Sequence, residues 1–268
     1  MSPKKEPRYF APEYYTTFYR KAIGSVYREK GMPTDEYQAL FNGVTTELAI
    51  GEASTEYLFF EKAAARIKAA IPNAKIIIVL RDPVERAFSA YCYHLRDGRE
   101  TLSFEESLAQ EPTRIQKKWQ VGWFYKRGGL YYKQVERYYQ LFDPSQIKII
   151  LWKDLNQNPQ KVCSKLFKFL QVDPDFTPDL SRSNKSAAPR SKYLNRYLFK
   201  NRKLKKWIKA PFSESLYLKV SGLLKQIFYA EKKPLDPDLC QHLRKSYYAD
   251  IDQLEELTSM DLSHWKEQ

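Results

Sequence analysis

The sequence of 268 residues predicts an α/β fold of three layers, in which helices flank a central parallel sheet. Two runs of branched apolar residues, 76–80 and 147–152, are typical of strands covered on both faces of such a sheet. Each run is followed by a helical pattern, over 83–95 and 159–170, and this alternation is typical of βαβ units. The hydrophobic content of 43% and the lack of a clear linker predict one domain spanning 1–268.

The first strand is expected to run directly into a helix. Asp82 is a suitable N-cap, Pro83 fits the first helical position, and Glu85 stands three residues after the cap. Arg81 would therefore lie at the carboxyl end of a strand and beside a helix N-terminus, where α/β sheets collect anionic ligands. A phosphate site is one interpretation. The residues alone equally allow Arg81 and Arg86 to pair with Asp82 and Glu85 on a solvated surface.

The segment from Leu80 to Tyr91, Leu-Arg-Asp-Pro-Val-Glu-Arg-Ala-Phe-Ser-Ala-Tyr, resembles the 3′-phosphate-binding segment of the sulfotransferases that use 3′-phosphoadenosine 5′-phosphosulfate (PAPS). Within that superfamily it is most similar to the carbohydrate-modifying and bacterial branch, which includes the heparan sulfate sulfotransferases. The resemblance implies a fold of the P-loop type. It also implies that Arg81 and Ser89 hold the 3′-phosphate of the donor.

The segment from Lys5 to Phe10 resembles the Lys-Glu-Pro-x-Phe-Phe segment of the same family. The resemblance implies that Glu6 is the general base and places Lys5 next to the substrates. In the family a first strand and a Gly-x-x-Lys-x-Gly-Thr-Thr loop precede this segment. Only four residues precede Lys5, and the loop pattern occurs nowhere else in the sequence. We therefore expect a sheet without its usual first strand, and Lys4 or Lys5 is a candidate replacement for the loop lysine.

The residues from Leu48 to Ile50 suggest a short strand, and 56–70 has a helical pattern that ends before Pro72. The intervening Gly-Glu-Ala-Ser segment resembles the part of the family that lies beside the acceptor. Glu52 and Ser54 are therefore candidate acceptor contacts. Capping of the strand end explains the same two residues equally well.

Further along the chain, Ser103 is expected to cap a short helix over 103–108, and 119–125 is an aromatic loop that either covers a ligand or fills the core. The turn at Arg127 resembles the Arg-Gly-x-Tyr turn of the family, which implies a phosphate contact for Arg127. Gly128 and Gly129 would let the backbone approach a ligand or adopt positive φ. A helix over 132–142 follows.

The region after 180 is strongly basic. Between Arg182 and Lys209 there are eleven Lys or Arg residues and no acidic residue, which favours an anionic partner. The loop 183–190 resembles the second donor-binding loop of the family, and the resemblance implies donor contacts for Lys185, Ser186 and Arg190. The last helix is expected to begin near Asp236 and to reach Leu257, with Leu262 and Trp265 packing back as an anchor.

The composition bears on disulfide bonds, metal binding and the location of the protein. Three widely spaced cysteines form neither a disulfide nor a metal-ligand pattern, and no segment reaches the ~20 apolar residues of a membrane span. The expected location is the cytoplasm, or the Golgi lumen if a eukaryotic N-terminal anchor has been lost.

The resemblance to the family implies transfer of a sulfuryl group from PAPS to a hydroxyl of a carbohydrate or glycolipid. The bisphosphate PAP would be the product, the acceptor could itself be anionic, and no metal is implied. Two alternatives stay open: a non-catalytic relative that binds nucleotide or glycan, and a basic protein that binds nucleic acid through the cluster after 180. No known nucleic-acid-binding module is visible in that cluster.

Overall fold

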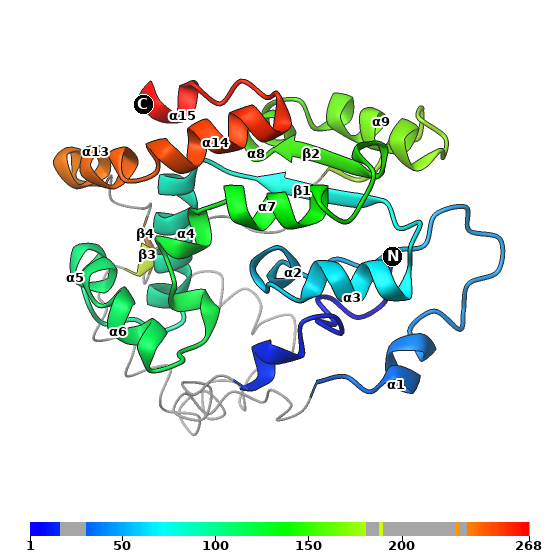
Figure 1. The fold of residues 1–268 in the computed structure, drawn as a ribbon, viewed down its shortest axis with the longest axis horizontal. Helices are drawn as coiled ribbons and strands as arrows, with labels where there is room; N and C mark the ends of the chain where they lie inside the picture. The colour runs from blue at the N-terminus through cyan, green and yellow to red at the C-terminus, as the bar shows by residue number, and fades with distance from the viewer. Residues whose placement is uncertain (17–30, 181–187, 190–228, 231–234, 268) are drawn as a thin grey trace, which may run out of the picture.

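A computed structural model describes residues 1–16, 31–180, 188–189, 229–230 and 235–267. Within this part of the chain, β1 (Ile76–Leu80) and β2 (Ile147–Leu151) pair in parallel, with Ile76 opposite Ile147 and Leu80 opposite Leu151. The carboxyl ends of both strands therefore meet at one edge of the sheet (Figure 1). Helices flank the pair, so the predicted α/β class with a parallel sheet is confirmed.

The helices of the described residues follow one another in chain order as α1 (Thr34–Ala39), α2 (Glu56–Phe59), α3 (Ala63–Ala70), α4 (Pro83–Arg96), α5 (Phe104–Ala109), α6 (Glu111–Gln116), α7 (Tyr132–Tyr139), α8 (Trp152–Gln157), α9 (Pro159–Leu170), α13 (Pro237–Lys245), α14 (Tyr248–Thr258) and α15 (His264–Glu267). Short 3₁₀ turns are η1 (Pro12–Thr16), η3 (Val121–Trp123), η4 (Arg127–Gly129) and η5 (Pro144–Gln146). A second, antiparallel pair consists of β3 (Ala188–Pro189) and β4 (Tyr229–Ala230).

The helices form the outer layers around the strand pair. α14 packs on α7, α9 packs on β2, and β3 and η4 lie beside α4 (Figure 1). The C-terminal residues close one side of the core, because Leu262 and Trp265 are almost completely buried. The predicted anchor at the end of the chain is therefore confirmed.

The start of α4 follows the predicted pattern closely. Asp82 caps the helix by accepting a hydrogen bond from the Glu85 N–H at 2.9 Å, and Pro83 occupies the first helical position. The other carboxylate oxygen of Asp82 is paired with Arg244 of α13 at 2.8 Å, in a buried ion pair. A local cap is thus combined with a contact across 162 residues of sequence.

Several predicted elements are wrong in part. Leu48 and Ile50 form no strand among the described residues and are exposed, because no neighbouring strand pairs with them there. The helical pattern over 56–70 is broken at Phe60, whose extended backbone separates α2 from α3 and lets Phe59 pack on Phe124. The last helix is also divided, at Ser246 and Tyr247, where the buried Tyr247 ring fills the core between α13 and α14.

The prediction that β1 is covered on both faces holds for one face only. Ile78 and Leu80 are buried, whereas Ile77 and Val79 are 38% and 47% exposed. A continuous apolar run cannot distinguish these two cases, because alternate side chains of a strand point to opposite faces.

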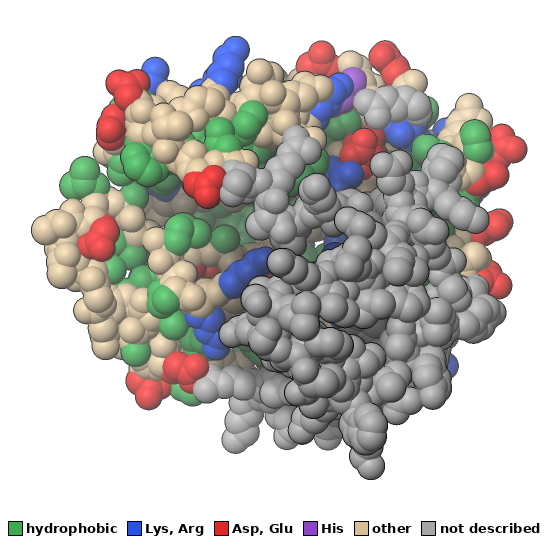
Figure 2. Space-filling model, turned by 180° about the vertical axis from the view of Figure 1, so that it is seen from behind, with side chains coloured by type: hydrophobic (Ala, Val, Ile, Leu, Met, Phe, Trp, Pro, Cys, Tyr) green, Lys and Arg blue, Asp and Glu red, His purple; other side chains and the backbone are tan. Residues whose placement is uncertain are grey.

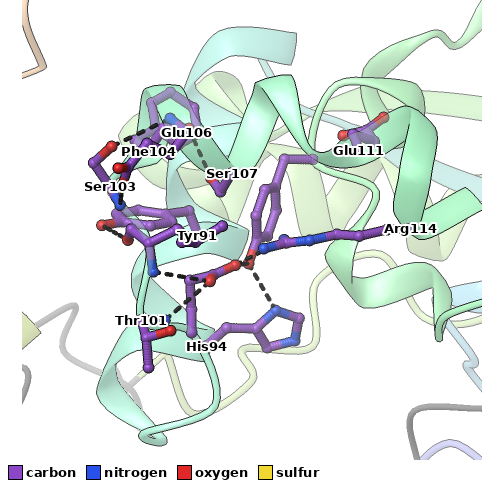
Figure 3. Close-up of polar contacts among 12 residues, drawn as sticks. Tyr91, His94, Thr101, Ser103, Phe104, Glu106, Ser107, Glu111 and Arg114 are labelled. Atoms are coloured by element: carbon purple, nitrogen blue, oxygen red, sulfur yellow. Dashed lines mark hydrogen bonds and ion pairs between the residues drawn. The ribbon is translucent and has the colours of Figure 1, made fainter.

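A buried polar network holds the α4–α6 region together. The Glu100 carboxylate accepts hydrogen bonds from Arg114 at 2.7 Å and from the Tyr125 hydroxyl at 2.9 Å. The Tyr125 hydroxyl also lies 3.1 Å from Nδ1 of His94, whose ring stacks on Trp123. Figure 3 shows Arg114 and His94 directed toward the same centre. The aromatic segment 119–125 therefore contributes Trp123 and Tyr125 to the core.

Candidate functional site

Arg81 lies at the carboxyl end of β1, immediately before the N-terminus of α4. Its carbonyl accepts a hydrogen bond from the Tyr131 hydroxyl at 2.9 Å, which fixes the backbone at this point. Its guanidinium is about one-third exposed and pairs with the Glu85 carboxylate through Nε and Nη2, both at 2.9 Å. The backbone is therefore held firmly while the charged group reaches the surface.

The interpretation of this corner as a set of surface ion pairs is correct only for Arg81 and Glu85. Asp82 pairs instead with the buried Arg244. Arg86 forms hydrogen bonds with the carbonyl oxygens of Phe124 and Tyr125, both at 3.2 Å. Since Arg244 offsets the charge of Asp82, the cap does not leave an uncompensated carboxylate beside Arg81.

Arg81 and Ser89 share one side of α4. Arg81, Glu85 and Ser89 follow at intervals of four residues, which places them along one side of the chain as it enters and follows the helix. Ser89 is half-buried. The Arg81–Glu85 pair is partly exposed to solvent, so it contributes little energy and a phosphate can compete for the guanidinium.

Arg127 lies in η4, beside α4. Its N–H donates to Oε1 of Glu111 at 2.7 Å, and the N–H of Lys126 donates to Oε2 of the same carboxylate at 2.8 Å. Burial raises the pKa of Glu111, although these two hydrogen bonds act in the opposite direction. The exposed Arg127 side chain extends over the Phe59 ring, 5.8 Å from its centre.

The two glycines of this turn serve a different purpose from the one expected. Neither Gly128 nor Gly129 has a positive φ. A Cβ at Gly128 would overlap with the guanidinium of Arg86, and a Cβ at Gly129 would press on Pro83 and Tyr247. The glycines thus allow η4 to pack closely on α4.

A second group of candidate residues surrounds the N-terminal segment. Glu6 and Arg8 both have a left-handed backbone, with φ of 52° and 55°, on either side of the buried Pro7. The Arg8 guanidinium pairs with Glu6 and with Glu56, the latter at 2.8 Å. Burial acts to lower the pKa of Arg8, but the charges of Glu56, Tyr14 and Glu6, together with the hydrogen bond to Glu56, raise the pKa overall. Left-handed residues other than glycine are strained, so these contacts must hold the segment in place.

Glu52 and Ser54 hold the N-terminal segment around Arg8 in place through hydrogen bonds. Ser54 Oγ accepts a hydrogen bond from the N–H of Arg8 and donates one to Glu52, both at 3.0 Å. Glu52 also accepts a hydrogen bond from the Tyr57 hydroxyl. Burial raises the pKa of Glu52, and the hydrogen bonds from Tyr57 and Ser54 oppose that rise. These internal contacts favour a supporting role for the pair.

The structure arranges the predicted residues in two groups that α2 connects. The first group contains Lys5, Glu6, Glu52 and Ser54, and Arg8 of the same segment joins it to α2 at Glu56. Lys5 is exposed. The second group consists of Arg81, Ser89 and Arg127, and of these three Arg127 lies over Phe59 of α2. Lys185, Ser186 and Arg190 lie outside the described residues, as does the basic cluster 182–209. β3, which begins two residues after Ser186, lies beside α4.

Three residues of this region had no sequence signal. Arg8 stands at the variable position of its motif, Glu56 lies 48 residues away from it, and Arg244 is distant from Asp82 in sequence. Only folding brings these charges together. Among the residues that the structure describes, no three His, Cys, Asp or Glu side chains could hold a metal ion, and no helix is long and apolar enough to cross a membrane.

The chain is similar to known proteins in sequence and in fold. The model of the sulfotransferase family matches residues 2–178. The crystal structure of a sulfotransferase from Alicyclobacillus acidocaldarius is similar over 99% of this chain and 87% of that chain, with 34% identity and a TM-score of 0.75.

The curated relatives are much longer proteins. The bifunctional heparan sulfate N-deacetylase/N-sulfotransferase 3 of Mus musculus is 33% identical over 142 residues, which are 50% of this chain and 16% of the relative. Carbohydrate sulfotransferase 15 of Homo sapiens is 26% identical over 129 residues, which are 38% of this chain and 21% of the relative. The match to the family model and the fold shared with a bacterial sulfotransferase agree, and the chain belongs to the sulfotransferase family.

Proposed function

We propose that this chain transfers a sulfuryl group from PAPS to a hydroxyl of a carbohydrate or glycolipid. The observation that carries the proposal is the position of Arg81, at the carboxyl end of β1 and beside the N-terminus of α4, with Ser89 on the same side of the helix. The names of the relatives support a carbohydrate acceptor, because several of them modify heparan sulfate.

The donor site fits a phosphate in its chemistry. A guanidinium in an exposed, weak ion pair can exchange Glu85 for a phosphate oxygen, and the N-terminus of a helix of 14 residues favours negative charge. Arg127 lies beside the same helix as a further cation. Lys185, Ser186 and Arg190 are proposed to complete the donor site.

Glu6 is the proposed general base. The acceptor oxygen attacks sulfur, Glu6 takes the proton of that hydroxyl, and the bond between sulfur and the bridging phosphate oxygen breaks, which releases PAP. Arg8 holds the Glu6 carboxylate, while Glu52 and Ser54 hold the segment that carries it. Lys5, which is exposed beside Glu6, is a candidate contact for the acceptor or the sulfuryl group.

Calorimetric titration with PAP tests the donor site. Arg81→Ala should weaken binding by about 1.5–3 kcal/mol, the value of a charge-assisted hydrogen bond, or roughly ten- to 150-fold in affinity. Arg96→Ala, at the other end of α4, is the matched control and should bind like the wild type. Equal affinity of folded Arg81→Ala and wild type would remove this site.

Transfer of labelled sulfate from PAPS to a glycan acceptor tests the reaction itself. Glu6→Gln should bind PAP normally and lose transfer, since the amide cannot accept the proton. If the wild type binds PAP but moves no label to any glycan, the non-catalytic alternative replaces the proposed reaction.

A further inference from the structure

We propose that one side of α9, with the hollow at its beginning, binds a sulfated or carboxylated glycan chain. Trp152, Lys161, Lys165 and Lys168 form this region, which we call the α9 surface. It rests on the proposed function, because it specifies where the part of an anionic acceptor chain beyond the reacting sugar is held.

The α9 surface begins at the same edge of the sheet as Arg81. Leu151, the last residue of β2, lies opposite Leu80, which immediately precedes Arg81. α8 starts at Trp152 and its six residues span about 9 Å, so α9 begins near this edge and then packs back along β2 (Figure 1). The α9 surface is therefore connected through α8 to the sheet edge that carries Arg81.

The charges of α9 are of one sign and are not neutralised. This helix of 12 residues contains three lysines and no acidic residue. Lys161, Lys165 and Lys168 recur at spacings of four and three, which places them on one side over about 10 Å. All three are exposed, and none forms an ion pair with a described residue. Figure 2 shows the molecule from behind, with basic side chains that project from the upper edge beside acidic ones.

A hollow of about 800 Å³ lies between the first turns of α9 and the turn at Pro174 and Asp175. Its lining includes the side chains of Gln157, Asn158 and Ser164 together with the three lysines. Asn158 does not cap α9 with its side chain, so N–H groups of the first turn remain available at this end. Amide and hydroxyl groups between cations suit the hydroxyl, carboxylate and sulfate groups of a glycan. Asp175 is the one carboxylate among the described residues of the lining.

Trp152 directly follows β2 as the first residue of α8, and it is 41% exposed. Tryptophan is usually well buried, and an exposed indole presents a flat apolar face on which the C–H face of a sugar ring can stack. Grooves for single-stranded nucleic acid place successive bases on successive aromatic rings, whereas none of the described residues that line the hollow is aromatic. The combination therefore favours a glycan.

The test is binding of a fluorescent heparin-derived octasaccharide to the full chain at several salt concentrations. The triple variant Lys161→Ala, Lys165→Ala, Lys168→Ala should bind about ten-fold more weakly, with a shallower salt dependence. Trp152→Ala should also weaken binding, but without a change in the salt dependence. The control triple variant Lys62→Ala, Lys117→Ala, Lys245→Ala removes three exposed lysines elsewhere and should stay within about two-fold of the wild type.

Equal losses in the two triple variants, or no loss in the first, would overturn the α9 surface. So would a DNA duplex of the same total charge that competes as well as the unlabelled octasaccharide. Each variant is also titrated with PAP, which should bind normally. If PAP fails to bind the wild type while octasaccharide binding still depends on the three α9 lysines, the proposed reaction is lost and the α9 surface remains.

Discussion

Arg86 illustrates at the scale of one residue how a charge in a sequence motif can become a packing element. The sequence allowed Arg86 to form an ion pair on the surface. Instead, its guanidinium donates hydrogen bonds to the carbonyls of Phe124 and Tyr125 and lies against the backbone of Gly128. The contact joins α4 to η4, the turn that carries Arg127. Gly128 is therefore required because of the space that Arg86 occupies.

Gly128→Ala should destabilise the protein, because the new methyl group displaces the Arg86 guanidinium from its two carbonyl partners. We expect a loss of about 1–3 kcal/mol in the free energy of unfolding, measured by urea denaturation. Gly43→Ala is the matched control, since a Cβ at Gly43 would meet no atom within 4 Å. Equal stability of the two variants would contradict the role given to this contact.

At the scale of elements, α4 depends on α13 as much as on its own sequence. The Asp82 cap is held by Arg244, which also donates to the carbonyl of Trp265 in α15. Burial acts to lower the pKa of Arg244, but the hydrogen bond that Arg244 donates to Asp82 contributes to a net rise. The C-terminal helices thus fix the N-terminus of α4, where the phosphate is proposed to bind.

Arg244→Met should cost about 3–5 kcal/mol of unfolding free energy, because it leaves the buried Asp82 carboxylate without a counter-ion. Denaturation by urea at neutral pH measures this loss. Lys133→Met, which breaks an exposed pair with Glu136, should leave the midpoint unchanged. A loss for Arg244→Met no larger than that of the control would show that the pair does not hold the helix.

At the scale of the whole molecule, buried ionisable groups make stability depend on pH in two opposite ways. Burial raises the pKa values of Glu52, Glu56, Glu111 and Asp250, so their protonation favours the folded state as the pH falls. His94 has the opposite effect on stability as the pH falls. Burial, followed by the charges of Arg99 and Arg114, lowers its pKa well below the ordinary value of 6.5.

As the pH falls, His94 takes up a proton at a higher pH in the unfolded chain than in the folded chain. The contribution of His94 to stability is therefore complete above pH 6.5 and is lost as the pH falls below that value. His94→Gln should therefore lose less stability than the wild type between pH 6.5 and 5, by up to about 1.4 kcal/mol per pH unit. Urea denaturation across this range measures the free energy of unfolding of the wild type and of His94→Gln. The carboxylates contribute equally to both proteins, so their contribution cancels in the difference. The exposed His242→Gln is the control; identical pH profiles for wild type and His94→Gln would refute the expectation.

Local patterns determined much of this protein before any tertiary contact was known. The apolar runs located both strands within a residue, the Asp-Pro-x-Glu pattern located the start of α4, and the helix over 159–170 has the predicted bounds. These features are predictable because caps, periodicity and strand ends depend on neighbours within a few residues.

Tertiary structure decided the features that depend on partners far away in the sequence. It paired Asp82 with Arg244 and Arg8 with Glu56, left Ile77 and Val79 exposed on β1, and broke two helical patterns at Phe60 and Tyr247. In each case the outcome is set by which group fills the space beside the residue, and the residue's own type does not specify that group. The sequence by itself determined where β1 ends and α4 begins, and only packing decided which charges surround that corner.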